Sequence, residues 1–351
     1  MKFFVKIYIF ALLFVGYTVV CQATIPVGYY SNANGKTKAE LKTALYNIVK
    51  IHTQLEYYAS SAYFLTTDWN PAGYIWDMYS NYQRPTWSGM NREHSLPKSW
   101  WSSAPETTVA YSDLHNLYPS DATANSAKLN YGLGEVTGTP EYTNGVIKVG
   151  ANGFPGYTGT VFEPDDEYKG DFARDYMYVV TSYENYANNW RSTGTSSMLL
   201  GGTYPIFRPW AVELLLKWHR NDPVSDKEIN RNNAVYGFQN NRNPFIDHPE
   251  LAEYIWGKYK GQNWVEGATL PDDDIAFVIQ PNPVNNELTV KLNNPEQAIF
   301  YIRSLSGITL KTGKFSAEGT LAIADLSNGM YILVVYSEAK RKVSKFVVHH
   351  E

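Results

Sequence analysis

Apolar and polar positions follow two different periods along the chain, one before and one after residue 275. In the earlier part, apolar residues recur three or four positions apart, which predicts amphipathic helices. These helices are expected at 37–58, from Asp171 through Val180, at 209–220 and at 225–239. In the later part, apolar and polar residues alternate, which predicts short strands. These strands are expected at 287–292, 299–302, 321–323, 330–335 and 345–348. The pattern predicts an α+β protein: a mixed domain followed by a small all-β sandwich domain.

The segments between the predicted helices carry turn signals. Residues 60–90 are rich in Tyr, Trp, Asp and Asn, with Pro71 and Pro85 at two turns, so strands and turns are expected there. Their aromatic rings are expected in the core rather than as platforms for stacking bases. The Gly- and Thr-rich segment 134–161 predicts one or two hairpins.

The first 23 residues have the pattern of a secretory signal. Lys2 and Lys6 precede an apolar run from 7 to 20, which is too short and wrongly flanked for a membrane span. The mature chain is expected to begin near Thr24. A lipoprotein anchor at Cys21 is the alternative, disfavoured by the bulky Val20 before it. Cys21 is the only cysteine, so a secreted chain has no internal disulfide to form.

Net charge limits how this protein could bind a polyanion. The whole chain carries −4, and residues 24–275 carry about −8 once the two signal lysines and the slightly basic final segment are removed. An acidic domain has no net basic field to attract nucleic acid. Any polyanion must therefore be held by a local group of Lys and Arg together with a bound cation.

Candidate chemistry begins at 91–101, where Glu93 and His94 are adjacent. Neighbouring side chains on a strand point to opposite faces, so the two share a site only where the strand ends or kinks. Pro97 suits such an end. Glu93 offers oxygen to a hard cation, and His94 can take a proton from water, so a metal-assisted hydrolase is the first hypothesis. The alternative for this pair is a strand-end carboxylate beside a structural histidine.

A second candidate ligand follows within residues 113–132. Ser120 or Asp121 can cap a short helix, and Gly132 fits just beyond its end. Asn125 lies inside that helix, where asparagine is unfavourable, and its amide oxygen is a ligand that Mg²⁺ or Ca²⁺ accepts. The alternative for Asn125 is a solvated polar face.

These stretches resemble the bacterial endonuclease I family, and the likeness continues through 162–174, 218–223 and 241–250. The resemblance implies a ββα-metal site in which His94 is the general base and Glu93 and Asn125 bind Mg²⁺, with Ca²⁺ or Mn²⁺ as alternatives. It implies an endonuclease acting on DNA, with RNA as a further substrate. Little sequence specificity and 5′-phosphate ends are expected.

The same resemblance calls for cations at the substrate. The family uses an arginine to neutralise the scissile phosphate, and Arg174 is proposed for that catalytic role. The alternative is a structural ion pair with Asp171 or Asp175. Further substrate-binding residues are predicted at the following positions: Arg92, Lys98, Lys128 and Arg242. His52 and His248 are expected to be structural.

After an acidic linker, Pro281-Asn282-Pro283, the segment 325–331 and the basic run 340–342 resemble the C-terminal sorting domain of the type IX secretion system. A carbohydrate-binding sandwich is the alternative. The expected division is a signal peptide at 1–23, a catalytic domain at 24–262, a linker at 263–275 and a sorting domain at 276–351. The protein is therefore expected to be secreted or on the cell surface, with the secretion machinery as a partner and no stable membrane span.

Two other functions are open to such a sequence. One is a surface adhesin or binding protein that keeps the fold without turnover, and the other is an extracellular phosphodiesterase for small esters. Zinc protease chemistry is not supported, because the chain contains no His-Glu-x-x-His spacing.

Overall fold

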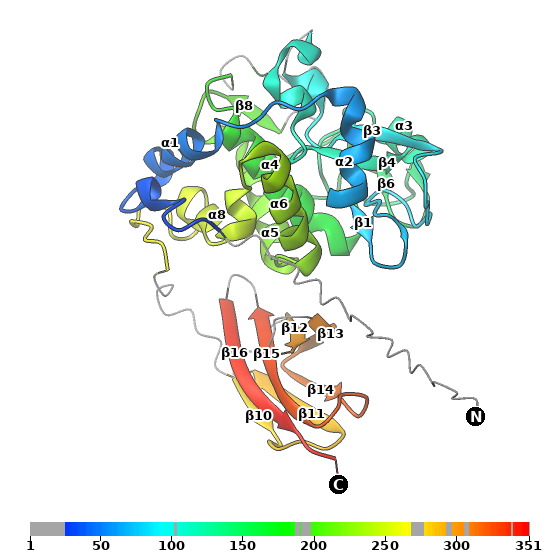
Figure 1. Cartoon of the computed structure of the whole chain (residues 1–351), viewed down its shortest axis with the longest axis vertical. Helices are drawn as coiled ribbons and strands as arrows, with labels where there is room; N and C mark the ends of the chain where they lie inside the picture. Colours follow the sequence, from blue (N-terminus) through cyan, green and yellow to red (C-terminus); the bar gives the residue numbers. More distant parts are fainter. Residues whose placement is uncertain are drawn as a thin grey trace, which may run out of the picture.

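The computed structural model describes residues 25–101, 104–186, 190, 198–267, 277–292, 297–304, 309–337 and 340–350. The predicted signal peptide and most of the predicted linker lie outside the described residues. Helices and small sheets form one part of the molecule, and a strand-only part follows near the C terminus (Figure 1). The α+β class predicted from the sequence is confirmed.

A central helix organises the first part. α4 (Lys169–Ser182) is buried along almost its whole length, and α1 (Lys38–Val49) and α5 (Pro209–Asn221) pack against it (Figure 1). The side chains of Arg174 and Tyr178 are completely buried in this helix. The guanidinium of Arg174 must therefore find its partners inside the protein.

The capping signals predicted the start of the next helix correctly. α6 (Asp226–Gln239) begins after Ser225, whose hydroxyl accepts a hydrogen bond from the backbone N–H of Glu228. The Glu228 carboxylate in turn accepts from the backbone N–H of Ser225, which completes a capping box. Two short helices follow, α7 (Pro244–Asp247) and α8 (Leu251–Ile255).

The segment between α1 and the first strands differs from the prediction. The helix expected over 37–58 ends at Val49, and beyond it the backbone N–H of Thr53 donates to the carbonyl of Gln239 at 2.8 Å. The last two residues of that predicted helix lie in η2 (Tyr57–Ala59), and the first residues of the segment expected to form strands and turns instead form α2 (Ser60–Thr67). Long-range contacts therefore override the local pattern here.

A short pair of antiparallel strands is followed directly by a helix, which gives a ββα arrangement. β3 (Met90–His94) pairs with β4 (Leu117–Asp121), so that Glu93 lies opposite Tyr118. α3 (Ala122–Lys128) follows β4 without a loop. The remaining strands of this part are β1 (Trp69–Asn70), β2 (Tyr74–Ile75), β5 (Tyr142–Thr143), β6 (Lys148–Ala151), β7 (Thr160–Glu163), β8 (Leu199–Gly201) and β9 (Ile206–Phe207).

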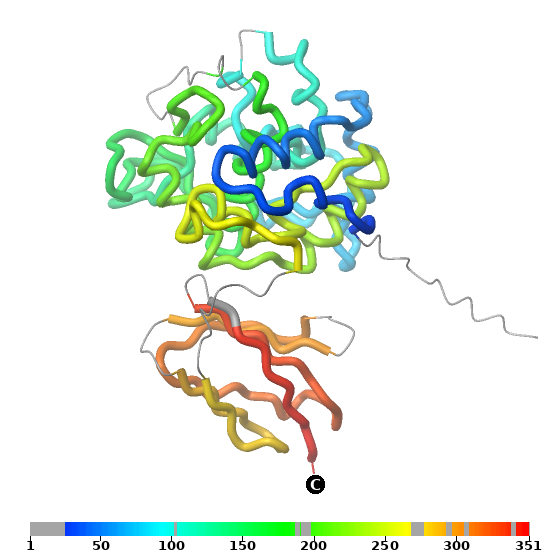
Figure 2. The backbone as a smooth tube through the Cα atoms, turned by 90° about the vertical axis from the view of Figure 1, so that its left-hand side faces the viewer, coloured from blue at the N-terminus to red at the C-terminus, as the bar shows by residue number. Residues whose placement is uncertain are grey.

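The C-terminal part is all-β, as predicted. Its strands are β10 (Phe277–Gln280), β11 (Glu287–Leu292), β12 (Gln297–Arg303), β13 (Thr309–Ser316), β14 (Glu318–Ala322), β15 (Gly329–Ser337) and β16 (Lys340–Val348). They form one antiparallel sheet in the order β10-β11-β14-β13-β12-β15-β16. β13 and β14 share only the pair Ser316 and Glu318, and buried residues from both sides of this point form one core. Strand β16 ends far from the helices (Figure 2).

The two parts have separate hydrophobic cores. One core is built from residues between Tyr30 and Trp264, and the other from residues between Val284 and Val348. We therefore propose two independently folding domains, the first extending past its predicted end at 262 to include Trp264, and the second over 276–351. In the part of the chain that the structure describes, no helix combines the length and apolarity needed to cross a membrane.

Candidate active site

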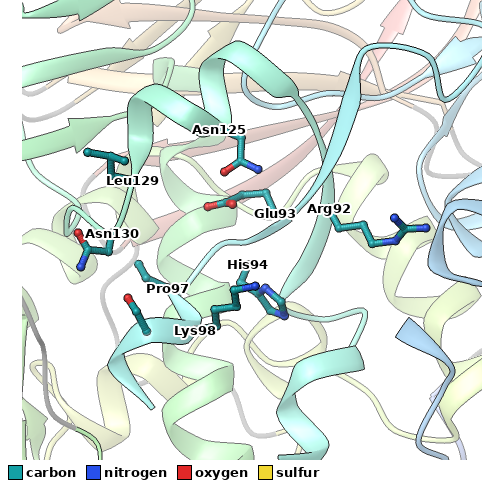
Figure 3. Close-up of a pocket in the computed structure, with 9 residues that line it drawn as sticks. Arg92, Glu93, His94, Pro97, Lys98, Asn125, Leu129 and Asn130 are labelled. Carbon is teal, nitrogen blue, oxygen red and sulfur yellow. The ribbon is translucent and has the colours of Figure 1, made fainter. Parts of the chain in front are cut away.

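The pocket at the end of β3 holds the residues that the sequence singled out. Because β3 ends at His94, the adjacent side chains of Glu93 and His94 both border the same space, a pocket of about 450 Å³ (Figure 3). Its lining residues are Arg92, Glu93, His94, Pro97, Lys98, Ser99, Asn125, Leu129 and Asn130. The structure thus brings the carboxylate, the imidazole and the helix asparagine together.

Asn116 holds the chain in the bend after His94. Its side-chain oxygen accepts from the backbone N–H of Leu96 at 2.8 Å, and its amide donates back to the Leu96 carbonyl at 3.3 Å. The carbonyl of Asn116 also accepts from the N–H of Ser95 at 2.9 Å. This role of Asn116 could not be predicted from the sequence, because only the fold places residue 116 beside residue 96.

The orientation of His94 determines which nitrogen can act as a base. Nε2 lies 2.8 Å from the carbonyl oxygen of Tyr111, which can only accept, so Nε2 carries the proton and Nδ1 keeps its lone pair. Three rings hold the imidazole: Tyr57 stacked at 6.0 Å, Tyr111 tilted at 5.1 Å and Trp101 edge-on at 5.3 Å. Burial lowers the pKa of His94 to about 3, so the ring is neutral at physiological pH.

The loop that supplies the Tyr111 carbonyl is anchored by Asp113. The hydroxyls of Tyr178 and Tyr183 donate to Oδ2 of this buried carboxylate at 2.7 and 2.6 Å. The side-chain amide of Gln239 donates to Oδ1 at 2.8 Å. The acceptor that sets the His94 tautomer is therefore tied to α4 and α6.

Glu93 is paired with a lysine inside the protein. Nζ of Lys128 donates to Oε1 of Glu93 at 2.6 Å and to the carbonyl of His94 at 3.4 Å. Burial raises the pKa of Glu93, and the nearby ammonium of Lys128 opposes that rise. Lys128 was predicted to bind substrate. The structure corrects this, because its side chain is fully buried and does not line the pocket.

Asn125 reaches the pocket from the first turns of α3. Asp121 caps this helix, as predicted, with Oδ1 accepting from the N–H groups of Thr123 and Ala124 at 3.0 and 2.8 Å. The Asn125 amide faces the Glu93 carboxylate (Figure 3).

The oxygen atoms of Glu93 and Asn125 fit a hard divalent cation. Magnesium takes one or two protein oxygens and keeps several water ligands, so a single carboxylate and an amide suffice. Zinc sites are built from clusters of His, Cys and carboxylates. Across the described residues no group of three such side chains could hold a metal ion. The chemistry of the donor set therefore favours Mg²⁺, Mn²⁺ or Ca²⁺.

Two of the predicted cations line the pocket. Lys98 is exposed, with its ammonium 5.2 Å from the Tyr111 ring, and Arg92 is half-buried and points away from Glu93 and Asn125 (Figure 3). No ion pair joins either side chain to a carboxylate in the described part of the chain. Both residues therefore contribute positive charge to the lining of the pocket.

Arg174 lies elsewhere, in a buried ion pair. Its Nε and Nη2 donate to the two carboxylate oxygens of Glu228 at 2.5 and 2.8 Å, and Nη1 donates to the Asp222 carbonyl at 2.7 Å. Asp171 is a more distant partner, at 3.8 Å. The structural alternative therefore describes Arg174, and the proposed contact with the scissile phosphate is corrected, because every guanidinium nitrogen is directed at protein acceptors.

Arg242 is corrected for the same reason. It is 2% exposed, and its Nε and Nη2 donate to both oxygens of Asp247 at 2.6 and 2.8 Å. Nη2 also donates to Oδ1 of Asn233 at 2.8 Å. This bidentate pair spans α7, from the segment before the helix to its last residue, and is not part of the pocket. His52 and His248 also lie outside the pocket lining.

Replacing Arg174 by methionine is expected to destabilise the protein by about 3–5 kcal/mol, because Glu228 is left as an unpaired buried charge. Cleavage activity per folded molecule is expected to be unchanged. Urea unfolding and active-site-normalised rates measure the two effects. Lys217→Met, which breaks the exposed pair with Glu135, is the control and should cost no more than about 1 kcal/mol. If Arg174→Met keeps its full stability but loses its cleavage activity, the correction is refuted and Arg174 contacts the scissile phosphate.

Comparison with known proteins covers both parts of the chain. The family model described as Endonuclease I matches residues 37–250, and the model described as Secretion system C-terminal sorting domain matches residues 278–349. The chain is 35% identical over 239 residues to an extracellular ribonuclease of Bacillus amyloliquefaciens, which is 65% of this chain and 78% of that protein. It is 34% identical over 241 residues to an extracellular ribonuclease of Bacillus subtilis (strain 168), with the same two shares.

Proposed function

Because the chain belongs to the endonuclease I family and is a nuclease, we propose that it is a divalent-metal-dependent endonuclease that hydrolyses phosphodiester bonds of DNA and RNA. One observation carries the proposal. The Nε2–H of His94 donates to the Tyr111 carbonyl, which leaves Nδ1 as a base in a pocket shared with Glu93 and Asn125. RNA is included because the relatives named above are ribonucleases.

In the proposed reaction, Nδ1 of His94 takes a proton from a water molecule as its oxygen attacks phosphorus. The bond between phosphorus and the 3′ oxygen breaks, so the products carry a 5′-phosphate and a 3′-hydroxyl, the latter completed by a proton from solvent. Because burial lowers the pKa of His94, the ring is unprotonated throughout the neutral range. Its three ring contacts fix the orientation of the imidazole beforehand, so no further entropy is lost in orienting it during the reaction.

Glu93 and Asn125 would hold the metal ion. A bound Mg²⁺ would supply positive charge at the oxygen that leaves. The pair with Lys128 keeps Glu93 ionised and fixed in orientation, although burial alone would favour its protonated form. Lys98 and Arg92 add positive charge beside the phosphate. Contacts to phosphate carry no base information, so little sequence specificity is expected.

The protein is secreted or located at the cell surface, because it carries a secretion sorting domain and its relatives are extracellular. We propose that this C-terminal domain engages the type IX secretion machinery and takes no part in the chemistry. All pocket residues come from β3, from Pro97 and the start of η3 (Lys98–Trp100) after it, and from α3 and the residues directly following it.

The test is cleavage of plasmid DNA and of a single-stranded RNA by the purified protein, with Mg²⁺ or with EDTA. Both substrates are expected to be cut only with Mg²⁺, and activity is expected to return when Mg²⁺ is added in excess over the chelator. A ligase that requires 5′-phosphate ends should rejoin the DNA fragments without prior kinase treatment. Undiminished cleavage in EDTA, or fragments that need the kinase, would contradict the metal mechanism.

A further inference from the structure

We propose that Arg92 and the three aromatic residues around it form a binding subsite for an unpaired nucleobase next to the cleavage pocket. This group, here called the Arg92 cluster, consists of Arg92, Tyr57, Tyr58 and Trp87. The inference rests on the proposed nuclease function and extends it to a substrate class. The enzyme should favour single-stranded over double-stranded nucleic acid.

The cluster places a cation among aromatic faces. The guanidinium carbon of Arg92 lies 5.2 Å from the ring centre of Trp87, 5.5 Å from Tyr57 and 6.0 Å from Tyr58. Its Nε donates to Oγ of Ser60, and Nη2 donates to the Tyr58 carbonyl, each at 2.7 Å. The plane of the guanidinium is therefore fixed by the protein before any ligand arrives, which lowers the entropy lost on binding.

Among the described residues, no carboxylate neutralises the charge of Arg92, whereas four other arginines each have such a partner. Arginines 84, 174, 231 and 242 each form an ion pair with a carboxylate at 2.8 Å or less. Arg92 makes no ion pair among the described residues, and its hydrogen-bond partners are uncharged oxygens. A cation of this kind in an acidic domain is suited to a polyanion, and its flat face is suited to stacking.

One ring of the cluster is open to solvent. The Tyr58 side chain is 80% exposed, whereas Trp87 is half-buried and stacks at 5.5 Å on the buried ring of Phe64. Tyr57 is half-buried and tilted against Tyr111 at 4.2 Å. The cluster thus combines two half-buried rings, held in place by their neighbours, with one exposed ring. This is the construction of a platform on which a nucleobase can stack.

The cluster adjoins the reacting groups. The Tyr57 ring is parallel to that of His94 at 6.0 Å, and Tyr58 contacts Tyr57 edge-on at 5.3 Å. Arg92 itself lines the pocket. A strand whose phosphate lies in the pocket can therefore place a neighbouring base on the cluster.

Only an unpaired base can use such a platform. In a duplex each base is stacked between its neighbours and paired at its edge, so its face is not available without unstacking. Stacking on an aromatic side chain accepts any base, which agrees with low sequence specificity. Double-stranded substrates are left with the phosphate contacts alone, which predicts weaker binding for them.

The experiment measures binding in EDTA, where no cleavage is expected, at one fixed salt concentration. The probe is a fluorescein-labelled 12-nucleotide DNA single strand, compared by anisotropy with the same sequence as a duplex and with an abasic strand of equal length. Tyr58→Ala is expected to weaken binding of the normal single strand roughly 5- to 100-fold, the range for loss of one stacked base. It should leave the duplex and the abasic strand unchanged. Tyr58→Phe keeps the ring and should restore the affinity.

Tyr82→Ala is the matched control. Tyr82 is also an exposed tyrosine beside an arginine, with Arg84 at 4.5 Å from its ring, but Arg84 is paired with Asp121 and does not line the pocket. Its substitution should not change binding of the single strand. The inference is overturned if Tyr58→Ala binds the normal strand as wild type does, if it weakens the abasic strand equally, or if Tyr82→Ala has the same effect.

A cleavage measurement separates this inference from the proposed function. With Mg²⁺, the ratio of single-strand to duplex cleavage rates is expected to fall in Tyr58→Ala by the same factor as the binding ratio. If wild-type protein cuts neither substrate, the proposed function fails while the binding result still decides the nucleobase subsite. If cleavage is normal but the ratio does not move, the subsite is refuted and the nuclease function stands.

Discussion

Replacing His94 by alanine is expected to lower the rate of phosphodiester cleavage by roughly two to four orders of magnitude, the loss typical of a missing general base. The ring is the only group of the described pocket lining that is both neutral and able to accept a proton from water at neutral pH. Magnesium affinity should be nearly unchanged, since Glu93 and Asn125 are retained. Single-turnover rates on a fluorescent DNA and calorimetric titration with Mg²⁺ measure the two quantities.

His219→Ala is the control for this experiment. Like His94, His219 is buried, has its pKa lowered to about 3 mainly by burial, and contacts a carbonyl through Nε2, that of Pro249 at 2.9 Å. It does not line the pocket. His219→Ala should lose stability but keep its rate per folded molecule. Cleavage by His94→Ala at close to the wild-type rate would remove His94 from the mechanism.

Elements with strong local signals could be predicted from the sequence. The capping box at Ser225 and the cap at Asp121 are local hydrogen-bonding patterns, and both occur as expected. Alternation over 287–292 predicted β11 with its bounds, because a half-buried strand must place apolar groups on one face. α2 could not be predicted in this way, since its segment is rich in residues that also favour strands and turns.

The functions of the basic residues were harder to predict, because charge is visible in a sequence but its partner is not. Arg174 pairs with Glu228, 54 positions away, and Lys128 pairs with Glu93, 35 positions away. Both ion pairs form only when the fold brings distant segments together. Arg92 is the opposite case. Among the described residues no carboxylate pairs with it, so its positive charge remains available at the pocket.

Glu93→Gln is expected to change both metal binding and folding. The amide removes the only negative charge in the described pocket lining, so magnesium affinity should fall by at least roughly 10- to 100-fold, which is the loss found even for outer partners of metal ligands. It also leaves the buried ammonium of Lys128 without its counter-charge, at a cost of about 3–5 kcal/mol in the free energy of unfolding. Calorimetry with Mg²⁺ and urea unfolding in EDTA measure these two effects separately.

The double variant Glu93→Gln/Lys128→Met separates the two roles of the carboxylate. Removing both charges of a buried pair costs far less than removing one, so the double variant should recover most of the lost stability. Its magnesium affinity should stay low, because the ligand is still missing. Asn125→Ala should weaken magnesium binding without the stability loss, since Asn125 is half-buried and forms no ion pair. If Glu93→Gln binds Mg²⁺ with wild-type affinity, Glu93 is only the partner of Lys128, and the metal must be held elsewhere.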